Sequence, residues 1–523
     1  MNLKSSMPQI PMKFLCLWDK LCYSSKNAFL FQHYFVILHL NMLLCMKYDV
    51  IIIGSGLGGL ECAITLGRKG KRVLVLERQF QPGGCLQSYK RKGCYLDTGL
   101  HYIGGLDEGE PLHDAFKELG LLDLPWQRLD PKGFDEITIM GKTYRFAQGY
   151  ENFVNELAKD FPEEREGLEK YVEMLQTTDE QWLQQTNAYD YLCSIIHNKL
   201  LISIISGASI KMELRKKTLP LFTFAHGNGS FIESSWRLKG EGNMLINHML
   251  EEIKALGGEV ICNADVTELK EEDGKITKAI CKDGREFEAD IFISDAHPSV
   301  TVNLVKESKL IKKIFRMRMT TLKNTCGMFT LQLKMKPEAL PYFNHNKFVY
   351  DTDDVWTNIA VEPEQPKVKG VLISCPVPTD GSEYANVIDI LTPMKWEFIE
   401  PWANKTPGKR GEDYVEMKNN ISNQCLDLAE QVIPGLREMI EHSYTSTPLT
   451  YFTYNNSPFG SAYGVRKDYS NVLGTILSPK TPIPNLFLTG QSLMLHGLHG
   501  VTMTAKFTCD EIERSAQSTV HNS

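Results

Sequence analysis

The residues with the clearest chemical meaning form a glycine-rich turn, Gly54-Ser55-Gly56-Leu57-Gly58-Gly59. A continuous apolar run at 48–53 precedes the turn, apolar residues at helical spacing follow it, and a second apolar run at 72–76 ends at Glu77. This order predicts a strand–turn–helix–strand unit, in which the pyrophosphate of a dinucleotide binds at the N-terminus of the helix. Glu77 is expected to accept hydrogen bonds from a ribose, and its charge disfavours the 2′-phosphate of NADP.

A second pair of glycines indicates which dinucleotide binds. Gly83 and Gly84 follow Glu77 closely, and they would let the backbone approach a second stretch of phosphate and ribityl chain. FAD needs such a contact and NAD does not, so the pattern predicts FAD; the alternative is a simple glycine turn. Further cofactor contacts are expected near this pair and in a block of short strands at 257–294: Arg78, Cys85, Ser88 and Val266.

A segment near the C-terminus is predicted to complete the same site. An apolar run at 483–491 reads as a buried strand, and a helix is predicted from 502 to 516. The positive end of that helix would stabilise the negative charge that develops on a reduced flavin. The cofactor contacts expected there are Gly490, Gln491, Gly500 and Val501.

The chemistry of a flavin requires an oriented substrate and a source of protons, and no metal site is predicted. The thirteen cysteines include no CxxC pair, and none lies at 490–504, so we expect FAD to bind noncovalently. Hydride transfer from a flavin to an unsaturated substrate would require a proton donor beside the atom that takes the hydride. His101 and His499 are the predicted catalytic residues, with His496 as a further candidate, and each also has a purely structural interpretation.

Several of these motifs resemble those of a known family, the phytoene desaturase, carotenoid isomerase and retinol saturase group of flavin amine-oxidase-like proteins. The resemblance covers most of 46–516 and implies an FAD-dependent oxidoreductase that saturates a C=C bond of a polyene or isoprenoid. Retinol saturase-like sequences also carry glutamine at the position of Gln491, where the wider flavin family has an acid. The motifs that carry the resemblance are 54–77, Gly83-Gly84, 97–104, 448–464 and 484–491.

Other functions of the same fold stay open. A phytoene or carotenoid desaturase would remove hydrogen, a carotenoid isomerase would leave the redox state unchanged, a flavin amine oxidase would act on amines, and a lipid-binding escort would need no flavin. The sequence lacks a second strand–GxGxxG–helix unit. Electrons would therefore come from transient docking of NAD(P)H, a carrier protein, a quinone or oxygen.

The order of the motifs predicts an α/β protein, with a Rossmann-like FAD-binding domain built from discontinuous segments and a substrate domain built from two insertions. The insertions are expected to form an antiparallel sheet with helices on one side, above the flavin. The predicted FAD-binding segments are 46–123, 238–298 and 465–523, and the predicted substrate-domain segments are 124–237 and 299–464.

Composition sets limits on location and partners. Of 523 residues, 42% are hydrophobic and 23% are charged, with a net charge of -7, which excludes a disordered chain and argues against nucleic-acid binding. Residues 1–45 read as a misassigned start, a membrane anchor or a packed extra helix. The apolar run at 189–210 is interpreted as a core helix or as an entrance that dips into a lipid surface. We predict a cytoplasmic protein with an apolar, polyene-like ligand, and peripheral membrane contact is an open alternative.

Overall fold

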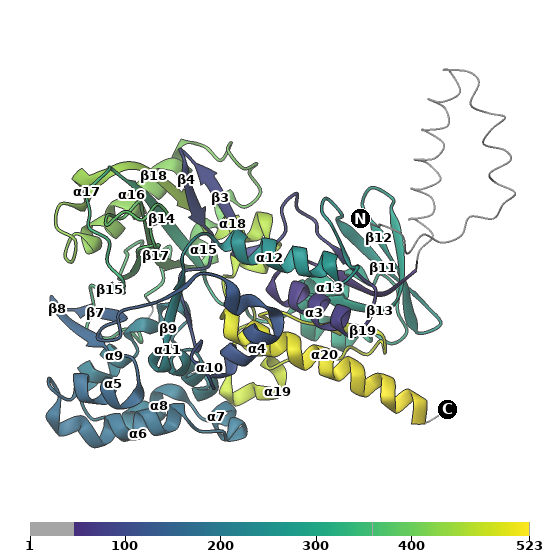
Figure 1. Ribbon diagram of the computed structural model, residues 1–523, viewed down its shortest axis with the longest axis horizontal. Helices are drawn as coiled ribbons and strands as arrows, with labels where there is room; N and C mark the ends of the chain where they lie inside the picture. Colours follow the sequence, from purple (N-terminus) through teal and green to yellow (C-terminus); the bar gives the residue numbers. More distant parts are fainter. Residues whose placement is uncertain (1–46, 358, 522–523) are drawn as a thin grey trace, which may run out of the picture.

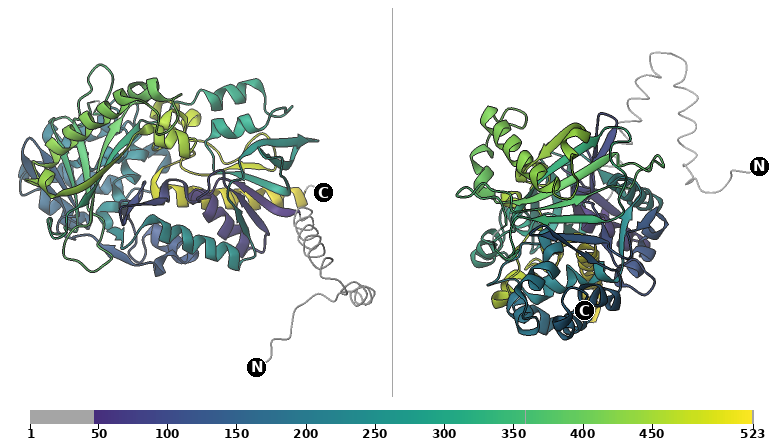
Figure 2. Two further views of the ribbon diagram at one scale, coloured as in Figure 1. Left: turned by 90° about the horizontal axis from the view of Figure 1, so that it is seen from above. Right: turned by 90° about the vertical axis from the view of Figure 1, so that its left-hand side faces the viewer.

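The computed structural model describes residues 47–521 with the exception of residue 358. Two seven-stranded sheets organise these residues, and they lie toward opposite ends of the long axis of the molecule (Figures 1 and 2). The interpretations of residues 1–45 fall outside the described residues. The predicted domain boundaries stay a prediction.

The first sheet brings together strands from distant parts of the chain. It consists of β1 (Tyr48–Ile53), β2 (Val73–Leu76), β10 (Glu259–Ile261), β11 (Val266–Glu272), β12 (Lys275–Cys281), β13 (Glu286–Ser294) and β19 (Leu486–Leu488). Strands β10, β2, β1, β13 and β19 run parallel, whereas β11 and β12 extend the sheet as an antiparallel hairpin. Because the carboxyl ends of parallel strands meet at one edge, the turns that follow β1, β2, β13 and β19 become neighbours.

Both faces of this sheet are covered, which explains the continuous apolar run in β1. Val50 and Ile52 belong to the core formed with the helices on one face. Ile51 and Ile53 belong to the core on the other face, which includes the β11–β12 hairpin. The helices of the first face are α3 (Leu57–Arg68), α12 (Gly242–Ala255) and α20 (Gly497–His521).

The second sheet is the predicted antiparallel sheet, with one parallel pair that the sequence did not indicate. In spatial order it contains β18 (Ile440–Ser446), β14 (Gly327–Met335), β17 (Val387–Met394), β16 (Gly370–Ser374), β15 (Asn346–Tyr350), β7 (Asp135–Ile139) and β8 (Lys142–Phe146). Every neighbouring pair is antiparallel except β15 and β7. The hairpin β7–β8 from the first insertion is thereby joined to the strands of the second insertion.

Helices cover both faces of this sheet, so the prediction of helices on one side was wrong. On one face Phe348 and Leu372 pack with α5 (Tyr150–Leu157), α6 (Arg165–Leu175), α8 (Ala188–Ile195), α9 (Lys199–Ile205) and α10 (Leu221–His226). On the other face Val349 and Ile373 pack with α16 (Glu412–Ala429). Successive side chains of β15 and β16 point to opposite faces of the sheet, and nearly all of them are buried. Both faces must therefore be covered.

The apolar run at 189–210 is not a single helix. It forms α8, α9 and a short 3-10 turn at Gly207–Lys211, and most of its large apolar side chains are buried in the core beside the second sheet. The interpretation as a core segment is therefore favoured over a lipid-facing entrance. Within the described part of the chain, no helix combines the length and the apolar character needed to span a bilayer.

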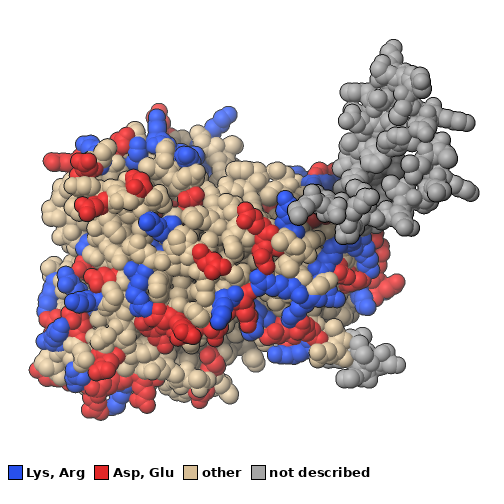
Figure 3. Space-filling view, viewed as in Figure 1, with Lys and Arg blue, Asp and Glu red and all other residues tan. Residues whose placement is uncertain are grey.

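Shorter elements connect the two sheets. Two small sheets are formed by β3 (Ser88–Arg91) with β4 (Cys94–Asp97), and by β5 (Ile103–Gly104), β9 (Ser235–Leu238) and β6 (Trp126–Arg128). The remaining helices are α4 (Pro111–Leu119), α7 (Glu180–Gln185), α11 (Gly229–Glu233), α13 (Pro298–Leu304), α14 (Lys313–Thr320), α15 (Trp396–Ile399), α17 (Leu436–Met439), α18 (Pro448–Tyr454) and α19 (Val472–Thr475). Basic and acidic side chains are interspersed on the face shown in Figure 3, as expected for a protein that does not bind a duplex.

Candidate functional site

An open cavity of about 320 Å³ lies between the two sheets. Its floor is the edge of the first sheet where β1, β2, β13 and β19 end, and its far wall includes Met328 of β14 and Leu391 of β17. Ligand pockets commonly occupy about 300–1,000 Å³. The cavity volume falls within this range, and its lining extends from the turn after β1 to the second sheet, as an elongated ligand would need.

The glycine turn between β1 and α3 forms one end of the cavity. Gly54 has a φ of 97°, a left-handed conformation that favours glycine, and α3 begins three residues later. Glu77, at the end of β2, is nearly buried, and its Oε2 atom accepts hydrogen bonds from the Ser55 backbone N–H at 3.0 Å and from Ser55 Oγ at 2.5 Å. The other carboxylate oxygen accepts from the Gln79 N–H at 2.7 Å. These bonds hold the acid beside the turn, as a ribose contact requires.

The second glycine pair lies directly against the first turn. The Gly83 N–H donates to the Ser55 backbone oxygen at 3.0 Å, and Gly83 has a φ of 113°. A Cβ atom on Gly84 would lie only 3.3 Å from the Gly56 Cα, so the two turns approach as closely as backbone allows. Together they present two backbone surfaces to one ligand.

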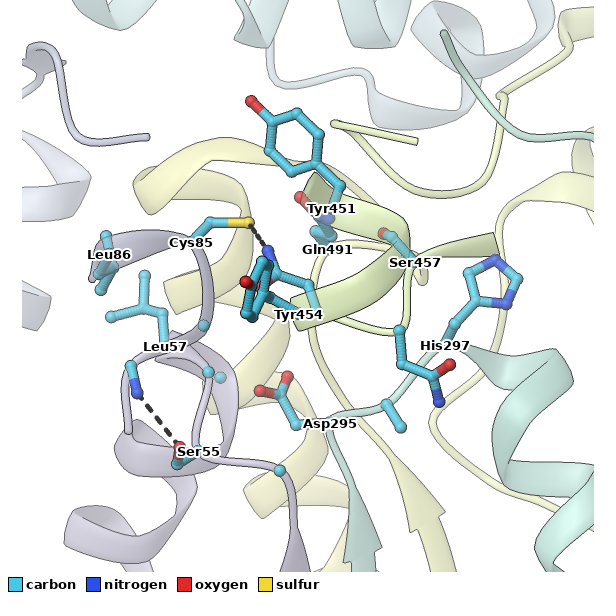
Figure 4. A pocket seen from close by; sticks show the side chains of 18 of the residues that line it. Ser55, Leu57, Cys85, Leu86, Asp295, His297, Tyr451, Tyr454, Ser457 and Gln491 are labelled. Carbon is cyan, nitrogen blue, oxygen red and sulfur yellow. Dashed lines mark hydrogen bonds between the residues drawn. The ribbon is translucent and has the colours of Figure 1, made fainter. Parts of the chain in front are cut away.

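Asp295 is the residue of this site that the sequence analysis missed. It follows β13, and its carboxylate accepts hydrogen bonds from the backbone N–H groups of Gly56 and Gly59. A Cβ atom on Gly56 or on Gly490 would collide with this carboxylate, which lies between the two turns (Figure 4). Burial, together with the nearby charge of Glu77, raises the pKa of Asp295 to about 7. The available signal was an acid at the carboxyl end of a buried strand, the same signal that identified Glu77.

The opposite end of the cavity is built from the C-terminal segment and the second sheet. Gln491 and the first turn of α20, with Gly497 and Val501, line it beside Tyr451 of α18. The turn after Gln491 is supported from behind by Lys467, whose Nζ donates to the backbone oxygens of Thr475, Ser492 and Leu493 at 2.8–2.9 Å. Burial lowers the pKa of Lys467 to about 7.

His101 lies in the wall of this cavity, with its side chain 12% exposed and both ring nitrogens without a hydrogen-bond partner among the described residues. Its Nδ1 atom lies 3.7 Å from an oxygen of Asp389, a buried carboxylate on β17. Gln332 holds that carboxylate by donating to its other oxygen at 3.0 Å. The ring thus has an acid on one side and the cavity beside it.

The comparisons with known proteins agree with this geometry. The family model for flavin containing amine oxidoreductases matches residues 57–314. The chain is 26% identical to the all-trans-retinol 13,14-reductase of Danio rerio, with 89% of this chain and 85% of that protein covered. It is 25% identical to the chloroplastic prolycopene isomerase of Arabidopsis thaliana, with 80% and 76% covered.

The chain is thus similar to these two proteins over most of its length, and to the flavin-containing amine oxidoreductase model over residues 57–314. The resemblance predicted from the sequence is confirmed, and FAD is the cofactor that the family supports. Among solved structures, cyclohexylamine oxidase from Brevibacterium oxydans has a TM-score of 0.57 at 15% identity, with 90% of this chain and 100% of that chain covered. At this identity the likeness concerns the fold alone, and it confirms the Rossmann-like α/β class.

Most of the predicted cofactor-binding residues line the cavity. The structure places these predicted cofactor residues on the cavity wall: Gly54, Ser55, Gly56, Leu57, Gly58, Glu77, Arg78, Gly83, Gly84, Cys85, Val266, Gln491 and Val501. Gly59, Ser88, Gly490 and Gly500 are not among the lining residues, and they pack behind the wall. Ser88, for example, donates to Asp97 at 2.7 Å, and a side chain on Gly59 would collide with the Gly54 carbonyl.

The structure separates the predicted catalytic residue His499 from His101. His499 does not belong to the cavity wall, and its ring lies 6.4 Å from that of His226. Burial lowers the pKa of His499 to about 4, so the ring is neutral near pH 7. His496 is also outside the wall; it donates to the Lys211 carbonyl at 3.1 Å, and burial lowers its pKa to about 4. Of the three histidines, His101 alone borders the cavity.

The two glycine turns, at 54–59 and 83–84, fit an FAD molecule bound in the cavity. A side chain at Gly56 or Gly58 would collide with the Asp295 carboxylate, and one at Gly84 would press on the Gly56 backbone, so glycine at these positions lets the two turns pack closely while both line the cavity. Cys85 borders the cavity, but burial raises the pKa of its thiol to about 11, which disfavours a thiolate that would attack a flavin. The residues therefore suit noncovalent binding.

Asp295→Asn tests the buried acid beneath the glycine turn. The folded pKa of about 7 lies above the ordinary 3.8, so folded protein binds more protons than unfolded protein between these values, and stability falls as the pH rises through this window. The variant is expected to escape this loss, gaining up to roughly 4 kcal/mol over the wild type at pH 8 relative to pH 4. Urea unfolding of flavin-free protein across this range measures the difference. Asp290→Asn, at an exposed site, is the control, and an equal pH dependence in wild type and Asp295→Asn would contradict the account.

Proposed function

We propose that this protein is an FAD-dependent oxidoreductase that reduces a C=C bond of a polyene or isoprenoid. The observation that carries the proposal is the continuity of one cavity. It runs from the ribose-binding acid Glu77 to Gln491 and the N-terminus of α20, and it continues between aromatic side chains of the second domain. The relatives named for retinol reduction and prolycopene isomerisation support an apolar polyene as the ligand.

In this proposal the two ends of the cavity hold the two ends of FAD. Glu77 and Val266 bind the adenosine part, and the turns at 54–59 and 83–84 bind the phosphates. Gln491 contacts the ribityl chain, and the N-terminus of α20 stabilises negative charge on the reduced ring. Arg78 closes the adenosine end, because its Nη2 donates to the carbonyls of Thr453 and Tyr454 at 3.0 and 2.9 Å.

The substrate would lie beyond the flavin, against the second sheet. The side chains there are apolar or aromatic and include Met328, Leu391, Tyr451 and Tyr463. Burial raises the pKa of the Tyr451 and Tyr463 hydroxyls far above neutrality, so both remain protonated and uncharged. A wall without charge suits a hydrocarbon chain and excludes water from the reacting bond.

When bound in its reduced form, FAD supplies a hydride to one carbon of a double bond. In our proposal His101 donates the proton that the neighbouring carbon takes, so that two hydrogens are added across the bond. The imidazole is then neutral and must take up a proton again before the next turnover. The residues leave the electron donor open, and NAD(P)H that docks transiently is one source consistent with the absence of a second dinucleotide motif in the sequence.

Redox-neutral isomerisation is the second candidate, because a prolycopene isomerase is among the relatives. The two reactions differ in mass balance, since reduction adds two hydrogens and isomerisation adds none.

We expect anaerobic mixing of the dithionite-reduced protein with retinoids and carotenoids to reoxidise the flavin and to yield a product heavier by two hydrogens. Absorbance and mass spectrometry follow both. Reoxidation by oxygen or quinones alone would reject the reductase, and a product of unchanged mass would favour the isomerase.

Glu77→Ala is expected to weaken FAD binding by about 10- to 100-fold, because hydrogen bonds to a carboxylate are lost at the ribose and at the turn. The ratio of flavin absorbance to protein absorbance after extended dialysis measures retention. Glu252→Ala is the matched control, since this acid on α12 is partly exposed and pairs with Arg68 at 2.7 Å. If the Glu77→Ala variant retained a full complement of FAD, Glu77 would not be a ribose-binding residue.

His101→Gln is expected to slow substrate-dependent flavin reoxidation by about 10²–10⁴-fold, because the proton donor is lost. FAD content and reduction by dithionite are expected to stay normal. His442→Gln, at a partly exposed histidine on β18, serves as the control. A rate unchanged in His101→Gln, at full flavin content, would assign the proton to another group or to water.

A further inference from the structure

We propose that the exposed face of α14 docks this protein on a membrane surface that carries anionic lipids. The helix has two distinct faces. Phe315 and Met319 turn inward and join a buried cluster, whereas Ile314 and Met317 are 72% and 54% exposed. Leu473, 87% exposed, lies beside them, because the Arg318 guanidinium donates to its carbonyl oxygen. Exposed apolar side chains in such a group indicate an interaction site.

Cations surround these apolar side chains. The segment 306–323 contains the single acid Glu307, and its exposed basic residues make no ion pair with a described residue. These residues are Lys306, Lys309, Lys312, Lys313, Arg318 and Lys323. Leu310 lies near Gly274 in the β11–β12 turn, which also carries Glu272 and Asp273. The whole protein has a net charge of -7, so the positive charge of this segment is opposite in sign to the net charge of the chain.

The exposed apolar side chains of α14 lie among basic side chains, and this combination favours an anionic lipid surface as the binding partner. A nucleic acid would attract the lysines but leaves Ile314, Met317 and Leu473 without a role, whereas a lipid surface offers both negative headgroups and hydrocarbon. The helix is also held firmly to the body of the protein. Arg316 donates to the backbone carbonyl of Val305 at 2.7 Å and to that of Val302, so the exposed face is rigidly presented.

The position of α14 gives the docking a consequence. The helix packs on α13, and Val300 and Leu304 of α13 line the large cavity. A membrane bound at α14 would therefore lie next to the end of the cavity lined by Val266, which packs in one cluster with Leu304 and which the proposed function assigns to adenosine. The lipid-facing interpretation of residues 189–210 placed this contact elsewhere, in a segment that is buried.

Sedimentation with vesicles tests the proposal on the full chain loaded with FAD. We expect binding to vesicles of phosphatidylcholine with about one-third phosphatidylserine, and binding weaker by at least about tenfold to phosphatidylcholine alone or at high salt. Lys312→Glu/Lys313→Glu is expected to lose about tenfold or more of the affinity for anionic vesicles. Ile314→Gln/Met317→Gln is expected to weaken binding without changing its salt dependence.

The matched control is Lys132→Glu/Lys409→Glu, which makes the same change in net charge at two exposed lysines of the second domain. Every variant retains residues 1–45, so differences between them report on α14. Unfolding midpoints and flavin content establish that each variant is folded. Equal vesicle binding by the α14 variants and the control would overturn the proposal, as would an α14 variant that changes only self-association in light scattering. Vesicle binding is measured without turnover, so it can fail or succeed independently of the proposed reaction.

Discussion

The close approach of backbone to backbone at the edge of the parallel sheet is the constraint on which the rest of this structure depends. Four strands end together, and the turns that follow β1 and β19 meet across Asp295. Side chains on the glycines of these turns would close the space, so the site exists only because the positions are glycines. Backbone N–H groups at the N-terminus of α3 then face the cavity. The buried carboxylate of Asp295 lies behind the turn and accepts hydrogen bonds from two other N–H groups, those of Gly56 and Gly59.

The buried carboxylate links stability to cofactor binding. Asp295 and Glu77 place two acids near one glycine turn, and the pKa of Asp295 is raised mainly by its burial, with a smaller contribution from the charge of Glu77. A carboxylic acid that is partly protonated near neutral pH reduces the repulsion toward a pyrophosphate. The same group makes the flavin-free protein less stable as the pH rises, because its ionised form is poorly solvated.

The second domain supplies what the dinucleotide fold lacks. Its sheet brings β14 and β17 across the cavity, so that uncharged side chains face the edge where a flavin ring would lie. The same sheet contributes Asp389, which faces His101 from the first domain. These two residues, which lie nearly 300 positions apart in the chain, come together only in the fold.

Local sequence determined the glycine turn, the strands on either side of it, Glu77 and the second glycine pair, because each depends on backbone conformation and on spacing within about 35 residues. The same reasoning predicted an antiparallel second sheet, and every neighbouring pair in it except β15 and β7 is antiparallel.

Only the tertiary structure decided which histidine borders the cavity, that Asp295 lies under the turn, and that helices cover both faces of the second sheet. The run at 189–210 shows the same limit, since it became two short helices and a turn in a core. Apolar periodicity reports that a segment is buried, whereas its partner is set by contacts between residues far apart in the chain, which no local pattern records.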